Sequence, residues 1–124
     1  VDYLQDLTVE GNKTMVEKTS LKSKTLKYLA EELDIPIVAG AQLRRDSDER
    51  RPRLSDFSDS SQLEKDADGA ILIYHHHVNK DKPEQTPEYN SYLLAEKVRD
   101  GMTGVVPVMF KKEYVSFHER IGNE

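Results

Sequence analysis

The sequence predicts an α/β fold in which helices cover a partly parallel sheet. Residues 1–4 resemble the end of a buried strand, residues 14–33 have a helical pattern, and residues 35–41 (IPIVAGA) form an uninterrupted apolar run. A strand that is apolar on both faces is typical of a parallel sheet covered by helices. Strand, helix and strand in this order predict a βαβ unit.

The helix predicted over residues 14–33 is amphipathic. Its apolar positions recur at spacings of three and four: Leu26, Leu29, Ala30 and Leu33. Lys22 stands one turn upstream, where an apolar residue would continue the stripe. We expect the helix to end near Asp34, because the residue before Pro36 avoids helical backbone angles.

The remaining residues predict a short helix and several strands joined by polar loops. The loops are residues 44–59 and 75–90, the short helix is 62–66, and the strands are 69–74, 92–98, 105–110 and 114–117. The last two strands are separated by a short charged segment, which predicts a C-terminal antiparallel β-hairpin.

Length and composition predict an incomplete domain. The chain has 124 residues, of which 36% are hydrophobic and 33% charged. This is polar for a self-contained domain. Because residues 1–4 resemble a strand whose beginning is missing, we expect the chain to be a fragment.

Charge and residue usage exclude several classes of protein. The chain has 18 basic and 23 acidic residues and a net charge of −5, which argues against a protein that coats DNA electrostatically. It does not exclude a ring-shaped assembly that contacts DNA through a few loops. No cysteine is present, which excludes disulfides and thiolate metal sites, and no apolar run reaches the length of a membrane span. We expect a cytoplasmic protein with no membrane partner.

Two polar residues follow predicted strands, where α/β proteins bind their ligands. Asp2 can hold Mg²⁺ through the water shell of the ion, and Gln42 can sense a γ-phosphate or orient an attacking water. Each has an ordinary alternative: Asp2 as a loop-capping residue, and Gln42 as a side chain that leaves the sheet into solvent.

Lys97 and Arg99 lie two positions apart on a predicted strand and therefore share a face. Two neighbouring cations repel each other unless an anion lies between them, and a phosphate bound by a neighbouring subunit would supply one, as with an arginine finger. The alternative is a solvated edge whose charges deter aggregation.

Two other polar clusters predict no binding site. His75, His76 and His77 alternate between faces of a strand end, so they cannot jointly chelate one metal ion. The charged residues 44–53 are typical of a solvated loop.

Several stretches stand in an informative order: VDYLQ (1–5), LKYLAEEL (26–33), IPIV (35–38), AQLRR (41–45), RPRLSDF (51–57), LEKDAD (63–68), IY (73–74) and EKVRDGMTG (96–104). Together they resemble the motor domain of DnaB-type replicative DNA helicases, from residue 1 to about residue 118. The most specific stretches are RPRLSDF with LEKDAD, and K-x-R-x-G-x-T-G. Several motifs in the right order are far stronger evidence than any single match.

The resemblance implies an incomplete RecA-like P-loop NTPase fold for residues 1–124, starting just before the Walker B aspartate. The phosphate-binding loop and the catalytic glutamate of the family lie upstream, so the chain alone is expected not to hydrolyse ATP. The intact protein is implied to be a homo-hexamer that uses ATP and Mg²⁺ to move along single-stranded DNA and unwind the duplex. Primase and a helicase loader are implied partners.

The resemblance also implies roles for particular residues. Asp2 resembles the Mg²⁺-associated acid and Gln42 the sensor that couples the γ-phosphate to the DNA loops. Arg99 resembles the finger that reaches the neighbour's ATP, and Lys97 its companion cation. The pore loop that touches DNA corresponds to residues 57–62, with Ser58, Asp59, Ser60 and Ser61 at its centre.

The sequence departs from the family at this pore loop. The usual Arg-Glu-Ser-Gly character is replaced by Ser-Asp-Ser-Ser at 58–61, which loses a cation and a glycine but keeps backbone N–H donors. Ala41 replaces a common serine. These differences favour a phage, plasmid or otherwise divergent member. Two alternatives stay open: a RecA-like ATPase with another role, and a non-catalytic assembly or regulatory module of a helicase complex.

Overall fold

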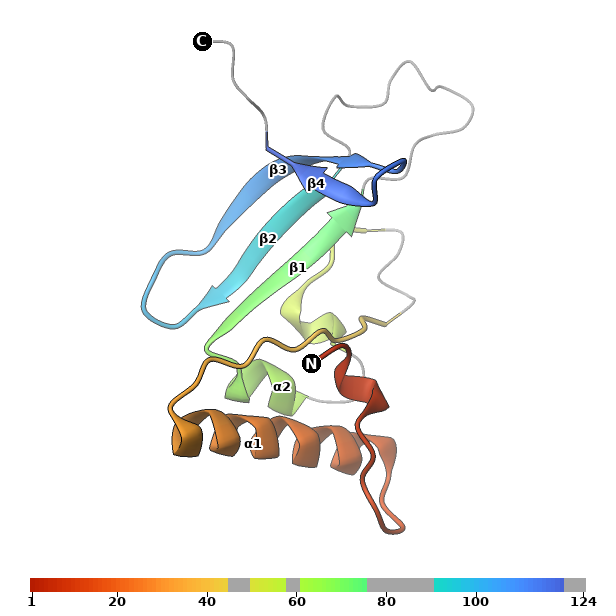
Figure 1. Cartoon of the computed structure of the whole chain (residues 1–124), viewed down its shortest axis with the longest axis vertical. Coiled ribbons are helices and arrows are strands. Elements are labelled where there is room, and N and C mark those ends of the chain that lie inside the picture. Colours follow the sequence, from red (N-terminus) through yellow and green to blue (C-terminus); the bar gives the residue numbers. More distant parts are fainter. Residues whose placement is uncertain (45–49, 58–60, 76–90, 120–124) are drawn as a thin grey trace. The chain divides into compact units, whose positions relative to one another are not determined.

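A computed structural model describes residues 1–44, 50–57, 61–75 and 91–119 of the chain (Figure 1). The chain divides into two compact units, Val1–Asp68 and Gly69–Glu124. The first holds the helices and the second holds a four-stranded sheet. None of the described helices combines the length and the apolar character that crossing a membrane would require.

The long helix of the first unit, α1 (Met15–Leu33), confirms the predicted helix. Thr14 caps its N-terminus in a reciprocal arrangement with Glu17: the Thr14 N–H donates to Glu17 Oε2 at 2.8 Å, and the Glu17 N–H donates to Thr14 Oγ1 at 3.3 Å. This capping box satisfies N–H groups that have no partner within the helix. Asp34 ends the helix in the left-handed conformation, with φ of 51°.

The buried face of α1 differs from the apolar stripe that the sequence predicts. Thr19, Lys22 and Ser23 are the buried residues of the helix, whereas Leu33 is 58% exposed. Lys22 is tolerated inside because its Nζ donates to the backbone oxygen of Gln5 at 2.8 Å, which satisfies a charged group that would otherwise be costly to bury.

The strands predicted over residues 1–4 and 35–41 are not formed, although both segments are fully described. Leu4–Asp6 is instead a 3₁₀ helix, η1. The segments lie side by side through three backbone bonds: Val1 N to Val38 O at 2.6 Å, Gly40 N to Val1 O at 2.8 Å, and Leu4 N to Gly40 O at 2.7 Å. Val38 is 84% exposed, so the apolar run lacks the two covered faces that a parallel strand requires. The predicted parallel sheet is not confirmed.

Two short helices complete the first unit: η3 (Leu54–Asp56), a 3₁₀ helix, and α2 (Ser61–Asp66), which confirms the predicted short helix. Asp66 joins α2 to α1 by accepting hydrogen bonds from Ser23 Oγ at 2.7 Å and Gln62 Nε2 at 2.6 Å. Lys27 of α1 adds an ion pair with Asp68, at 2.6 Å. Contacts with α1 therefore hold α2 and the end of this unit in place.

The second unit is a sheet in the order β1-β2-β3-β4 with every neighbouring pair antiparallel. Its strands are β1 (Gly69–His75), β2 (Ser91–Val98), β3 (Gly104–Lys111) and β4 (Ser116–His118). The β3–β4 pair confirms the predicted C-terminal hairpin. All four strands lie close to their predicted positions.

The two faces of this sheet differ in exposure. Leu72 pairs with Leu94, and both are buried. On the opposite face, Ile71 is 68% exposed and Ile73 is 57% exposed. Strand β1 is therefore buried on one face only in this unit.

Candidate functional site

The Asp2 carboxylate lies against the chain at Gly40. A Cβ added to Gly40 would lie 3.4 Å from Asp2 Oδ1 and 3.5 Å from Tyr3 Cβ. Asp2 is exposed, so its carboxylate is open to a ligand. The backbone bonds of Val1 and Leu4 to residue 40 fix this arrangement and bring Asp2 next to the segment that ends in Gln42.

Gln42 is exposed and follows that segment directly. Its backbone N–H donates to Gln5 Oε1 at 3.3 Å, and the backbone oxygen of Gln5 accepts the bond from buried Lys22. Gln5 therefore links α1 to the residue predicted to sense phosphate. The structure brings the segments of Asp2 and Gln42 together within the first unit.

The chain beyond Gln42 pairs with the residues that precede the predicted pore loop. Leu43 and Phe57 form an antiparallel bridge. The backbone N–H of Arg44 donates to the backbone oxygen of Asp56 at 2.8 Å. Of the predicted DNA-binding residues, Ser58, Asp59 and Ser60 lie outside the described residues. Ser61 is the exposed first residue of α2.

Asp56 and Arg50 form an ion pair that sequence reasoning missed, because residues 44–53 predicted only a solvated loop. Arg50 donates from both terminal nitrogens, to Oδ1 at 2.6 Å and to Oδ2 at 2.9 Å, and the Arg53 N–H adds a bond of 2.7 Å to Oδ2. The guanidinium of Arg50 lowers the pKa of the Asp56 carboxyl; burial opposes this effect and the Arg53 N–H reinforces it. The available signal was an aspartate that closely follows three arginines, in the RPRLSDF stretch and the Arg50 directly before it.

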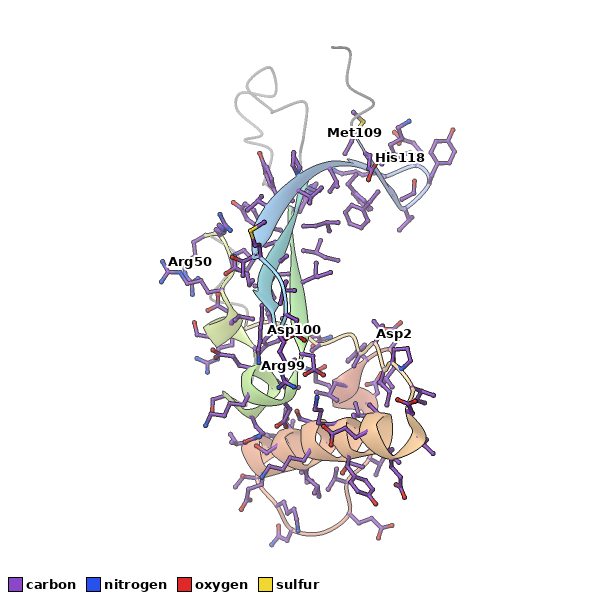
Figure 2. All side chains as sticks on the ribbon, turned by 90° about the vertical axis from the view of Figure 1, so that its left-hand side faces the viewer. Asp2, Arg50, Arg99, Asp100, Met109 and His118 are labelled. Carbon is purple, nitrogen blue, oxygen red and sulfur yellow. The ribbon has the colours of Figure 1, made fainter. Side chains whose placement is uncertain are left out.

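Lys97 and Arg99 do not share a strand face. Lys97 is near the end of β2, which stops at Val98, and Arg99 is exposed in the following turn (Figure 2). The β1–β2 register shifts between Ala70, which pairs with Lys97, and Ile71, which pairs with Ala95. The extra residue is Glu96, so a β-bulge precedes Lys97; bulges commonly re-aim side chains near functional sites.

Gly101 fixes the turn that carries Arg99. A Cβ at this position would lie 2.8 Å from Val98 Cγ1, a distance that real Cβ atoms do not tolerate. Glycine therefore allows the chain to fold back tightly after β2, with Arg99 on the exposed side of the turn. The K-x-R-x-G part of the motif is thus a strand end, a presented arginine and the glycine that the turn requires.

The described part of the histidine cluster has a structural role. The Nδ1 atom of His75 lies 2.7 Å from Oγ of the buried Ser91, and its ring meets Phe110 edge-on at 5.9 Å. His76 and His77 lie outside the described residues. Within the described ranges, no group of three or more His, Asp or Glu side chains is placed to hold a metal ion.

The fold defines a class of protein, the ATPase domains of DnaB-like helicases. The solved ATPase domain of G40P matches with a TM-score of 0.80 and 36% identity, over 95% of this chain and 42% of that one. A DnaB-like replicative helicase, solved in work on its interactions with primase, matches with a TM-score of 0.82 and 36% identity, over 95% of this chain and 29% of that one.

Sequence comparison gives the same assignment. A profile of the DnaB-like helicase C terminal domain matches residues 1–119. The replicative DNA helicase DnaB of Mycoplasma genitalium is 38% identical over 127 residues, covering 94% of this chain and 27% of that protein. The corresponding helicase of Geobacillus stearothermophilus is 34% identical over 123 residues, covering 94% and 26%.

The chain belongs to the DnaB-like helicase C-terminal domain family, which confirms the resemblance seen in the sequence. It spans about a quarter of the length of the curated relatives it matches.

Proposed function

We propose that this chain is the C-terminal part of the motor domain of a replicative DNA helicase, which couples ATP hydrolysis to movement along single-stranded DNA and to duplex unwinding. The observation that carries the proposal is the pairing of the chain after Gln42 with residues 56 and 57. This pairing joins a residue suited to sensing phosphate to the segment suited to binding DNA. A motor must couple these two events.

The proposed fold of the intact motor is RecA-like. Val1 bonds to residues 38 and 40, on either side of Ala39, and the apolar sequence at 35–41 suits a strand covered on both faces. With the rest of the motor packed on them, residues 1–4 and 35–41 would become neighbouring strands of a parallel sheet. The chain would supply one part of the nucleotide site, and the phosphate-binding loop would come from another part of the protein.

Asp2 is the residue of this chain that fits magnesium. It offers one exposed carboxylate against Gly40. Protein-bound Mg²⁺ keeps several waters and takes one or two carboxylates together with the phosphates of its substrate. A lone carboxylate therefore suits indirect coordination. Bound magnesium would neutralise charge on the phosphates of ATP.

Gln42 and Arg99 have distinct proposed roles in hydrolysis. The side chain of Gln42 senses the γ-phosphate or orients the attacking water, from a backbone position fixed by its bond to Gln5. Arg99 reaches the ATP bound by the neighbouring subunit of a homo-hexamer, and Lys97 adds a second positive charge. The exposure of Arg99 in a glycine-dependent turn supports a role toward a neighbour.

The DNA contact is proposed at Ser58, Asp59, Ser60 and Ser61. Without an arginine in this segment, contact would rely on backbone N–H groups and hydroxyls, which bind phosphate oxygens without reading sequence. Primase and a helicase loader are proposed further partners. Primase is supported by the DnaB-like relative whose solved structure concerns interactions with primase.

The proposal is tested by measuring ATP hydrolysis, with and without single-stranded DNA, for this chain and for the intact protein. We expect hydrolysis by the intact protein alone, stimulated by DNA. Hydrolysis without DNA stimulation would favour a RecA-like ATPase with another role, and no hydrolysis by either would favour a non-catalytic assembly module. Hydrolysis by the 124-residue chain would contradict the proposed division of the nucleotide site.

A further inference from the structure

We infer that Arg50 and Asp56 are positioning residues that couple DNA binding to ATP hydrolysis, by holding the start of the DNA-binding segment to the segment of Gln42. This inference rests on the proposed function. In this proposal, neither Arg50 nor Asp56 contacts DNA or nucleotide. They act through the backbone that they fix.

The Asp56 side chain is anchored in several directions at once. It is 6% exposed, and Asp56 is the only acidic residue among the buried residues of the described chain. It accepts bonds from both terminal nitrogens of Arg50 and from the Arg53 N–H. A bidentate arginine–carboxylate pair constrains orientation as well as distance, so Asp56 cannot rotate freely.

The backbone of Asp56 carries this constraint to the segment of Gln42. The Asp56 oxygen accepts the Arg44 N–H at 2.8 Å, and its neighbour Phe57 bridges to Leu43. Gln42 precedes this pair of contacts and Ser58 follows it. A displacement at Gln42 therefore reaches the DNA-binding segment through these two backbone contacts, with one covalent step on each side of them.

The ion pair determines whether that displacement is transmitted or lost. Separating a buried carboxylate from its partner is costly. The Arg50–Asp56 pair closes a turn, because Asp56 is the last residue of η3 and Arg50 lies six residues before it. With the pair intact, the turn moves as one piece. Without it, residues 50–57 can deform locally and absorb the movement.

A purely stabilising ion pair would have different consequences. The Arg50 side chain is 45% exposed and lies at the surface (Figure 2), so its removal creates no large cavity. We therefore expect Arg50→Ala to fold, with a lower unfolding midpoint because the buried Asp56 carboxylate loses its partner, while the link between Gln42 and the DNA-binding segment loosens. Arg50→Ala should therefore lower the stimulation of ATP turnover by DNA and leave the turnover without DNA nearly unchanged.

The test compares Arg50→Ala and Asp56→Asn in the intact protein, with Arg53→Ala as the matched control. Arg53→Ala removes the same charge from the same turn and keeps the backbone N–H that Asp56 uses. The measurements are ATP turnover without DNA, turnover with saturating single-stranded oligothymidine, and the midpoint of thermal unfolding. We expect basal turnover within about twofold of wild type and a DNA stimulation ratio reduced about fivefold or more, the range of ordinary coupling free energies.

Arg50→Lys gives a graded readout. Lysine keeps the charge but cannot form the two-pronged contact, so its stimulation ratio should fall between those of wild type and Arg50→Ala. A wild-type ratio in Arg50→Ala would overturn the inference, even if Asp56→Asn failed to fold. Equal losses of basal and stimulated turnover with a lowered unfolding midpoint would also overturn it, because the pair would then serve stability alone. Absence of DNA stimulation in the wild type would instead refute the proposed function, and the inference would fall with it.

Discussion

Ser23 Oγ donates a hydrogen bond of 2.7 Å to Asp66 Oδ2, joining positions that lie 43 residues apart in the sequence. Ser23 is buried on α1, and Asp66 belongs to the LEKDAD stretch that is among the most family-specific in the chain. The second aspartate of that stretch, Asp68, pairs with Lys27 of the same helix. These two aspartates therefore tie α2 and the residues that follow it to α1, and their role is architectural.

We predict that Asp66→Ala lowers the free energy of unfolding by about 1–3 kcal/mol, because it leaves the buried Ser23 hydroxyl and the Gln62 amide without this acceptor. The measurement is chemical unfolding of the intact protein followed by circular dichroism. Glu32→Ala is the control, since Glu32 is an exposed residue of α1 and surface substitutions change stability by about 0.5 kcal/mol or less. Equal effects of the two changes would contradict the architectural role.

How far the sequence predicted the fold depends on how local the determining interactions are. Helix α1 was predicted because its signals are local: Leu26, Leu29, Ala30 and Leu33 recur at helical spacing, and Pro36 follows directly after the helix. The β3–β4 hairpin was predicted for the same reason. The strands expected at 1–4 and 35–41 depend on covering layers, and the described chain leaves Val38 exposed.

The candidate site shows the same limit. Asp2 and Gln42 were chosen because each follows a predicted strand, and the structure joins their segments through the backbone bonds of Val1 and Leu4. The Arg50–Asp56 pair was not predicted, because a loop with several arginines gives no indication of which one reaches the carboxylate. Nor did the sequence reveal the bulge at Glu96, because the residues before it, YLLA (92–95), do not alternate between apolar and polar, so no break in alternation marks the extra residue.

The Arg50–Asp56 pair should make stability depend on pH in acid. Because the pKa of Asp56 is lowered in the folded state, the unfolded state binds more protons between the two pKa values. The contribution of the pair to folding stability is therefore present above the unfolded pKa of about 3.9. It is lost as the pH falls through the lowered pKa of the folded state. We predict that the gap between the urea midpoints of wild type and Asp56→Asn narrows as the pH falls below about 3.9.

Arg50→Ala provides the internal check on this pH dependence. It removes the same pair from the cationic side, so its midpoint should also approach that of wild type in acid. A gap between wild type and either variant that does not narrow as the pH falls below about 3.9 would show that the carboxylate of Asp56 gains nothing from Arg50 in the folded state.

Single-stranded DNA binding should respond to a cation restored in the proposed pore loop. We predict that Ser58→Arg raises the affinity of the intact protein for oligothymidine and steepens the dependence of log K on log salt by about 0.7, the value for one added phosphate contact on a single strand. Fluorescence anisotropy across a salt series measures both. Ser55→Arg is the matched control, because it adds the same charge to an exposed position of η3. Equal slopes in the two variants would show that the side chain at position 58 does not contact DNA.

The proposed action of Arg99 on a neighbouring subunit can be separated from an action within its own. We predict that Arg99→Ala lowers ATP turnover about 10³-fold, the lower end of the range for arginine fingers supplied from another subunit. Asp2→Ala should also be inactive, since it removes the proposed magnesium ligand. Mixed rings of the two variants should recover part of the wild-type turnover, because some sites then combine an intact Asp2 with an intact Arg99 from the next subunit. Mixtures as inactive as the separate variants, despite verified mixed assembly, would place both residues in the same subunit's site.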